Sequence, residues 1–156
     1  MRYTSLFLSA ALAAATASTA FAGEQVLEFK LVTKPIDLKV TEVANVEGGT
    51  VTSGKMFGVA YFKDGRVAIK DFVHSGDMTK GSGPMYGYST YTFEDGSSIT
   101  ARYTGAVKDG QTKGEYTILS GTGVYANATG TGGFESVKSS FKGAALFDGR
   151  FIVKTP

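Results

Sequence analysis

The amino-acid sequence predicts an all-β fold, an eight-stranded antiparallel β-barrel with a meander strand order. Three observations support this: short runs that alternate between apolar and polar residues, Asp-Gly pairs between such runs, and 21 glycines in a chain without cysteine. Alternation with period two is typical of strands with one buried face, and Asp-Gly between two such strands is a strong hairpin signal. The meander is expected to close into a barrel or to pack as a sandwich, and closure would remove exposed strand edges.

Residues 1–22 have the pattern of a secretory signal peptide. Arg2 provides a positive start, residues 6–17 form an apolar core, and Ala20-Phe21-Ala22 fits a cleavage site. The apolar core is shorter than the span of about 20 residues that a membrane helix needs. We therefore expect a cleaved signal peptide, no membrane span, and a single barrel domain over residues 23–156. The alanine-rich signal favours a bacterial protein that is periplasmic or secreted.

The expected strands follow one another with short turns between them. The first covers Gln25–Leu31, with Leu27, Phe29 and Leu31 on one face, and Pro35 predicts an edge or a bend after it. The later strand-like segments are residues 38–43, 55–62, 67–74, 85–93, 98–107, 114–119, 133–142 and 145–153. A turn is expected over residues 47–50, and Asp-Gly turns at positions 64, 95 and 109 give three hairpins of similar length.

The glycine-rich run over residues 116–134 predicts a sharp corner between two late strands. Its sequence, YTILSGTGVYANATGTGGF, resumes a strand pattern after the glycines. Glycine lacks Cβ, so the backbone can bend and approach its neighbours closely there. A phosphate-binding loop would need a helix after the glycines, and the residues that follow are strand-like. The run therefore indicates a small closed β-structure.

Composition and charge exclude several classes of function. The net charge is +2 and no run of lysine or arginine occurs, so we expect no nucleic-acid partner. A chain without cysteine has no disulfide, thiol nucleophile or zinc–thiolate site. A single histidine cannot build a site with two or three histidine ligands. We therefore expect no metal and no cofactor.

Two residues are weak candidates for catalysis. His74, the only histidine, ends an expected strand, where it is either a general base at the barrel mouth or a solvated side chain. Glu28 lies on the polar face of the first strand, and its carboxyl would act as an acid or base if that face pointed inward. An outward-facing Glu28 would be part of the ordinary solvated exterior.

A group of tyrosines provides the candidate ligand-binding residues. Tyr86 and Tyr88 share a face of one expected strand, Tyr103 lies on its hairpin partner, and Tyr116 starts the glycine-rich run. A tyrosine combines an apolar ring with a hydroxyl, which suits a cavity for a hydrophobic or phenolic molecule. The same residues would also suit an ordinary barrel core or a surface between two copies of the chain.

Two segments resemble the barrel family of allene oxide cyclases and dirigent proteins. Residues 86–105, YGYSTYTFEDGSSITARYTG, resemble the aromatic strand, turn and return strand of that family, and residues 116–134 resemble its glycine-rich corner. The resemblance implies an eight-stranded barrel with a ligand cavity at one mouth. Plant cyclases of the family cyclise an unsaturated fatty-acid epoxide, and dirigent proteins steer radical coupling. Of the cyclase pattern, Glu28 fits the glutamate, but Lys30 replaces the asparagine and the cysteine has no counterpart.

The sequence therefore predicts an exported small barrel that binds a small hydrophobic or aromatic ligand. One alternative is a cofactor-free cyclase or isomerase of the allene oxide cyclase type. Another is an oligomeric interaction module that associates through a tyrosine-rich face. The missing catalytic pattern favours a binding protein over an enzyme.

Overall fold

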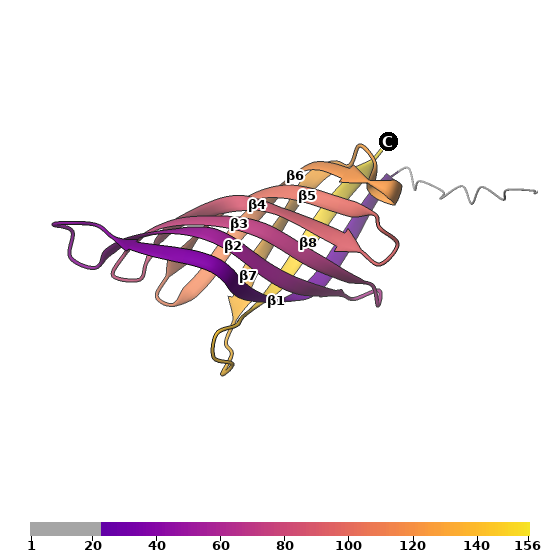
Figure 1. Ribbon diagram of the computed structural model, residues 1–156. Helices are drawn as coiled ribbons and strands as arrows, with labels where there is room; N and C mark the ends of the chain where they lie inside the picture. Colours follow the sequence, from indigo (N-terminus) through magenta and orange to yellow (C-terminus); the bar gives the residue numbers. More distant parts are fainter. Residues whose placement is uncertain (1–22) are drawn as a thin grey trace, which may run out of the picture.

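The computed structural model describes residues 23–156, which form one closed antiparallel barrel (Figure 1). The expected signal peptide lies outside the described residues. The elements are β1 (Gly23–Glu42), β2 (Gly49–Phe62), β3 (Val67–Thr79), β4 (Gly83–Phe93), β5 (Ser98–Lys108), β6 (Gln111–Thr122), the 3₁₀ turn η1 (Gly123–Tyr125), β7 (Thr129–Val137) and β8 (Ala145–Thr155). Each strand pairs with the next, and β1 pairs with β8. The predicted eight-stranded meander barrel is confirmed, and the sandwich is excluded.

The three Asp-Gly hairpin turns form where the sequence predicts them. The Asp64 carboxylate accepts a hydrogen bond from the Arg66 amide at 3.1 Å, and the Asp95 carboxylate accepts one from the Ser97 amide at 2.9 Å. Such local bonds favour a turn over a continued strand. Asp109 and Gly110 both have positive φ, 52° and 74°, as a two-residue type I′ hairpin turn requires.

The first strand is longer than its sequence pattern suggests. The segments expected on either side of Pro35 belong to one strand, β1, whose pairing register with β2 shifts between Pro35 and Asp37. Proline has no backbone N–H to donate, so a bulge at this point preserves the pairing on both sides. Beyond the bulge, the β1–β2 hairpin projects past the rest of the barrel (Figure 1).

Half of the barrel interior is filled by aromatic rings. Alternation along β1 points Leu27, Phe29 and Leu31 inward, as the sequence predicts. The Phe29 ring centre lies 5.1 Å from those of Phe62 and Phe151, and 5.5 Å from that of Tyr91. Such tilted ring pairs add to the stabilisation that burial alone provides. These rings form a continuous core close to the end of the barrel that carries the described chain termini.

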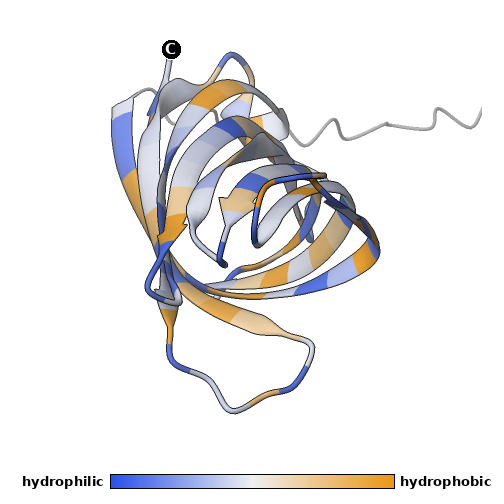
Figure 2. Ribbon diagram, turned by 90° about the vertical axis from the view of Figure 1, so that its left-hand side faces the viewer, coloured by the Kyte–Doolittle hydropathy of each residue, from blue (hydrophilic) through white to orange (hydrophobic). Residues whose placement is uncertain are grey.

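The same end is closed by a cluster built on the glycine-rich corner. Tyr125 of η1 packs on Phe93, with ring centres 5.2 Å apart, and its hydroxyl accepts a hydrogen bond from the Arg66 guanidinium. Arg66 also pairs with Asp64 and lies over the Phe93 ring at 5.2 Å. We call this filled region the packed end. The opposite region, where the β1–β2 hairpin projects, is the hollow end, and Figure 2 is viewed from that side.

Candidate functional site

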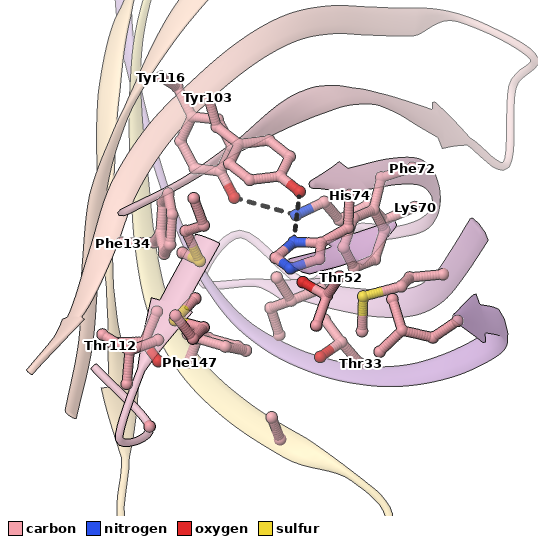
Figure 3. Close-up of a pocket in the computed structure, with 18 residues that line it drawn as sticks. Thr33, Thr52, Lys70, Phe72, His74, Tyr103, Thr112, Tyr116, Phe134 and Phe147 are labelled. Carbon is pink, nitrogen blue, oxygen red and sulfur yellow. Dashed lines mark hydrogen bonds between the residues drawn. The ribbon is translucent and has the colours of Figure 1, made fainter. Parts of the chain in front are cut away.

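The hollow end contains a cavity of about 310 Å³ inside the barrel (Figure 3). Much of its wall is apolar and comes from β1, β2, β3, β4, β5 and β8: Leu31, Leu38, Met56, Phe72, Met78, Met85, Val107 and Phe147. The polar groups are few, and the two basic ones are Lys70 and His74. An apolar cavity of this size with a few polar groups is the usual form of a small-molecule site.

Strand alternation brings the polar groups of the cavity together. On β3, Lys70, Phe72 and His74 share the inward face because side chains two residues apart point to the same side. Tyr103 enters from β5 and Tyr116 from β6, and these two strands pair Tyr103 directly with Tyr116. The four polar side chains therefore meet from three strands of a rigid sheet rather than from flexible loops.

Lys70 is the most unusual group of the cavity, because only 4% of the residue is exposed. Its Nζ donates a hydrogen bond to the Tyr116 hydroxyl at 3.1 Å and lies 4.2 Å from the Phe72 ring centre. Burial away from water disfavours the charged amine and lowers the pKa of Lys70 to about 7. The amine is therefore present in both charged and neutral forms near neutral pH.

His74 is held by a second hydrogen-bonded chain. The Tyr103 hydroxyl lies 3.2 Å from the Val73 carbonyl and 3.1 Å from Nδ1 of His74. Its single proton goes to one of these two acceptors, and the tautomer of His74 decides which. Burial, followed by the nearby charge of Lys70, lowers the pKa of His74. The imidazole is thus neutral at pH 7.

The buried tyrosines stay protonated and supply neutral hydroxyl groups. Burial raises the pKa of Tyr116, Tyr103 and Tyr91 above the ordinary value for a phenol. The Tyr91 and Tyr116 hydroxyls lie 2.9 Å apart. Tyr116 therefore links the Lys70 amine to the Tyr91 hydroxyl in the packed end. The ring of Tyr116 lines the cavity and packs on its other side against Tyr91 and Phe151 of the aromatic core.

The structure brings together three of the residues singled out by sequence. His74, Tyr103 and Tyr116 line the cavity. Tyr86 and Tyr88 instead point outward, with 53% and 49% of each residue exposed, because the inward face of β4 carries Met85, Gly87, Ser89 and Tyr91. These two tyrosines therefore lie outside this cavity, on the surface that the self-association hypothesis would use.

Glu28 also lies on the exterior of the barrel. It forms an ion pair with Lys63, and the hydrogen bond from that lysine lowers the pKa of the Glu28 carboxyl. The carboxyl is therefore ionised, and the side chain is exposed to solvent, which is the outward alternative of the sequence interpretation. Glu28 accordingly has no access to the cavity at the hollow end.

Lys70 is not among the site residues that the sequence predicts, although the alternation of β3 bears on its position. It stands two residues from Ala68 and Phe72, so period-two alternation places it on their face. The neighbouring face, with Ile69 and Val73, is also apolar, and the pattern alone does not tell which face is buried. Closure of the barrel determines which face of β3 points inward: Ala68 is buried, whereas Ile69 and Val73 are partly exposed.

The described residues contain no clustered metal ligands and no membrane-crossing helix. Within residues 23–156 no group of three histidine, cysteine, aspartate or glutamate side chains is placed to hold a metal. Over the same range no helix is long and apolar enough to cross a bilayer. The polar groups that line the cavity are the Lys70 amine, the His74 imidazole and the hydroxyls of threonines and tyrosines.

Solved structures of other proteins share this architecture. The pterocarpan synthase dirigent protein GePTS1 superposes with a TM-score of 0.58 at 15% sequence identity, covering 93% of this chain and 96% of its own. The chain has the dirigent-protein fold. A second dirigent protein, the pterocarpan synthase PsPTS1, gives a TM-score of 0.56 at 16% identity over 85% of this chain and 95% of its own. The dirigent-like resemblance found in the sequence is therefore confirmed for the fold.

Other comparisons add no further assignment. A protein of unknown function from the DUF3224 family of Shewanella oneidensis gives a TM-score of 0.46 at 20% identity, covering 82% of this chain and 98% of its own. No protein-family model matches the sequence, and no curated protein matches it. The dirigent fold thus rests on three-dimensional similarity, and function must be argued from the cavity.

Proposed function

We propose that this protein is a small-molecule binding barrel whose ligand is hydrophobic or aromatic and occupies the cavity at the hollow end. The cavity itself carries the proposal: about 310 Å³ of space lies between apolar side chains, with a few hydrogen-bonding groups at its floor. Removing the apolar part of a ligand from water would supply most of the affinity, and the hydroxyls and amine would orient it.

The two dirigent structures support a small-molecule role. Both are named as pterocarpan synthases, so in those proteins the barrel serves the formation of a small organic product. The sequence pattern of residues 1–22 adds the proposal that this barrel is exported and meets its ligand in the periplasm or outside the cell. Detection of the protein in a periplasmic or culture fraction, beginning at Gly23 by mass spectrometry, would test export separately.

A blocking substitution tests the binding proposal. Titration with the neutral probes cinnamyl alcohol and 4-propylphenol, followed by calorimetry, should give saturable binding to the unaltered protein. Thr52→Trp places an indole on the cavity wall and should abolish that binding. Val51→Trp is the matched control, because Val51 is the preceding residue of β2 and lies on the outer surface. Equal loss in both variants, or binding that Thr52→Trp leaves intact, would contradict the proposal.

A cofactor-free isomerase is the second candidate function, and the imidazole of His74 favours it. This side chain lies in the wall of the same cavity and contacts the Tyr103 hydroxyl, and as a general base it would remove a proton from a bound molecule. If a conversion is found, His74→Gln should lower kcat more than about 100-fold while binding of the neutral probes persists. Unchanged turnover in that variant would remove this role.

A further inference from the structure

The charge of Lys70 has no counter-charge in the described part of the chain. The ion pairs there lie on the surface and involve Lys30, Lys63, Arg66, Lys80 and Lys154. Lys70 instead faces hydroxyls and aromatic rings, with the ring centres of Tyr91, Tyr103 and Tyr116 at 5.3, 5.5 and 5.4 Å from Nζ. A buried, unpaired ammonium group is costly unless a partner compensates its charge.

The surroundings of Lys70 also determine where a partner can come from. One of its three donors is engaged by the Tyr116 hydroxyl, and the side chain lines the cavity beside His74 (Figure 3). No acidic residue lines this cavity. A negative charge that reaches Nζ must therefore belong to the ligand. The apolar wall between Lys70 and the mouth, including Met56, Met78 and Phe147, would hold the rest of that ligand.

We propose that the cavity selects organic acids, in which a hydrophobic or aromatic body fills the apolar part and a carboxylate pairs with Lys70 at the floor. The inference rests on the proposed function and adds the chemical class of the ligand. The carboxylate would accept a charge-assisted hydrogen bond from Nζ, which is stronger than a bond between neutral groups. A neutral ligand would leave the ammonium group without a counter-charge.

Acid binding should depend on pH in a defined direction. The titratable groups that face Lys70 are His74 on its own strand, Tyr91 on β4, Tyr103 on β5 and Tyr116 on β6. The residues that β1, β2, β7 and β8 contribute to this cavity include no titratable side chain. With its pKa near 7, Lys70 is charged at pH 6 and mostly neutral at pH 8. A carboxylate binds the charged form, so its affinity should fall as the pH rises through this range.

The test compares trans-cinnamate with cinnamyl alcohol, which share a carbon skeleton, by calorimetry on the full chain. At pH 6 the unaltered protein should bind the acid at least about tenfold more tightly than the alcohol. That ratio should shrink by about fivefold or more at pH 8. Lys70→Met should remove the preference. Lys55→Met is the control, because it removes the same charge from the exterior of β2 and should preserve the preference.

Each outcome discriminates between the two proposals. Equal affinities for acid and alcohol at pH 6 in the unaltered protein would overturn the organic-acid inference and leave the binding function standing. If Lys70→Met still prefers the acid over the alcohol, the inference is also overturned, because another group would then pair with the carboxylate. Absence of binding for both probes would overturn both proposals. The comparison at pH 6 and pH 8 uses the unaltered chain, so the inference stays testable even if Lys70→Met fails to fold.

Discussion

The two ends of the barrel are built from the same strands but differ in how their interiors are filled. At the packed end, Phe29, Phe62, Phe93 and Phe151 meet across the interior, and Tyr125 with Arg66 covers them. At the hollow end the same strands surround about 310 Å³ of space. An eight-stranded barrel is just wide enough to be filled by side chains or to hold one ligand. This barrel does both, one at each end.

The difference separates stability from binding. The packed end buries large aromatic surfaces, and it fixes the strands whose continuations carry Lys70, His74, Tyr103 and Tyr116. Site residues on strands are held more precisely than residues on loops, because pairing with the neighbouring strands fixes the backbone that carries each side chain. Substitutions at the packed end should therefore affect folding, whereas those at the hollow end should affect ligand affinity.

The largest expected contrast between the ends is between two phenylalanines of β8. Phe151→Ala should reduce the free energy of unfolding by about 3–5 kcal/mol, because a fully buried ring in contact with Phe29, Tyr91 and Tyr116 is lost. Phe147→Ala, at the cavity wall, should cost less than about 2 kcal/mol because open space already lies beside it. Urea unfolding measures both values. Equal losses in the free energy of unfolding would contradict the conclusion that the two ends are packed differently.

A smaller contrast is expected between Gly149, which faces an aromatic ring, and Gly133, which faces none. A Cβ at Gly149 would lie 2.2 Å from the Phe29 ring, so Gly149→Ala should cost about 1–3 kcal/mol through displaced rings. At Gly133 the nearest atom to such a Cβ is 3.6 Å away, which is ordinary contact. Gly133→Ala should therefore be nearly neutral in thermal unfolding. A neutral Gly149→Ala would show that the rings adjust without cost.

The smallest expected effect comes from the hollow end and depends on pH. The pKa of Lys70 is about 7 when folded and close to its ordinary value when unfolded, so between pH 7 and pH 8 the unfolded chain holds more protons. Stability should consequently rise by about 1 kcal/mol over that unit of pH. Lys70→Met should lose this rise. Urea unfolding at the two pH values measures it, and an identical slope in both proteins would mean that Lys70 is not desolvated.

The packed end was largely predictable from sequence, and the hollow end was only partly so. Alternation along β1 identified Leu27, Phe29 and Leu31 as one face, and Asp-Gly turns located two hairpins of this end, at Asp64 and Asp95, because both signals depend on neighbouring residues. The third such turn, at Asp109, lies at the hollow end. The inward face of β4 was harder to infer. Tyr86 and Tyr88 alternate as regularly as Met85 and Tyr91, and only pairing with β3 and β5 decides which set is buried.

The candidate site required information that no local pattern contains. His74, Tyr103 and Tyr116 stood out by residue type, but Lys70 resembles the surface lysines of other strands. Its burial follows from long-range packing, which places Tyr91 and Tyr116 against the same point from β4 and β6. Flanking Ala68 and Phe72 at two-residue spacing are consistent with this burial, but the equally apolar face of Ile69 and Val73 leaves the choice undecided in the sequence.

The pairing of β1 with β8 has a consequence for how the chain can be connected. Every other strand pair joins neighbours in sequence, so the ring is completed by this one long-range contact, in which Gly23 lies opposite Thr155. The two ends of the described chain are therefore adjacent, and the ring has no privileged first strand. A circularly permuted form, joined by a short linker there and opened between Asp109 and Gly110, would retain all the strand pairs and both interior halves.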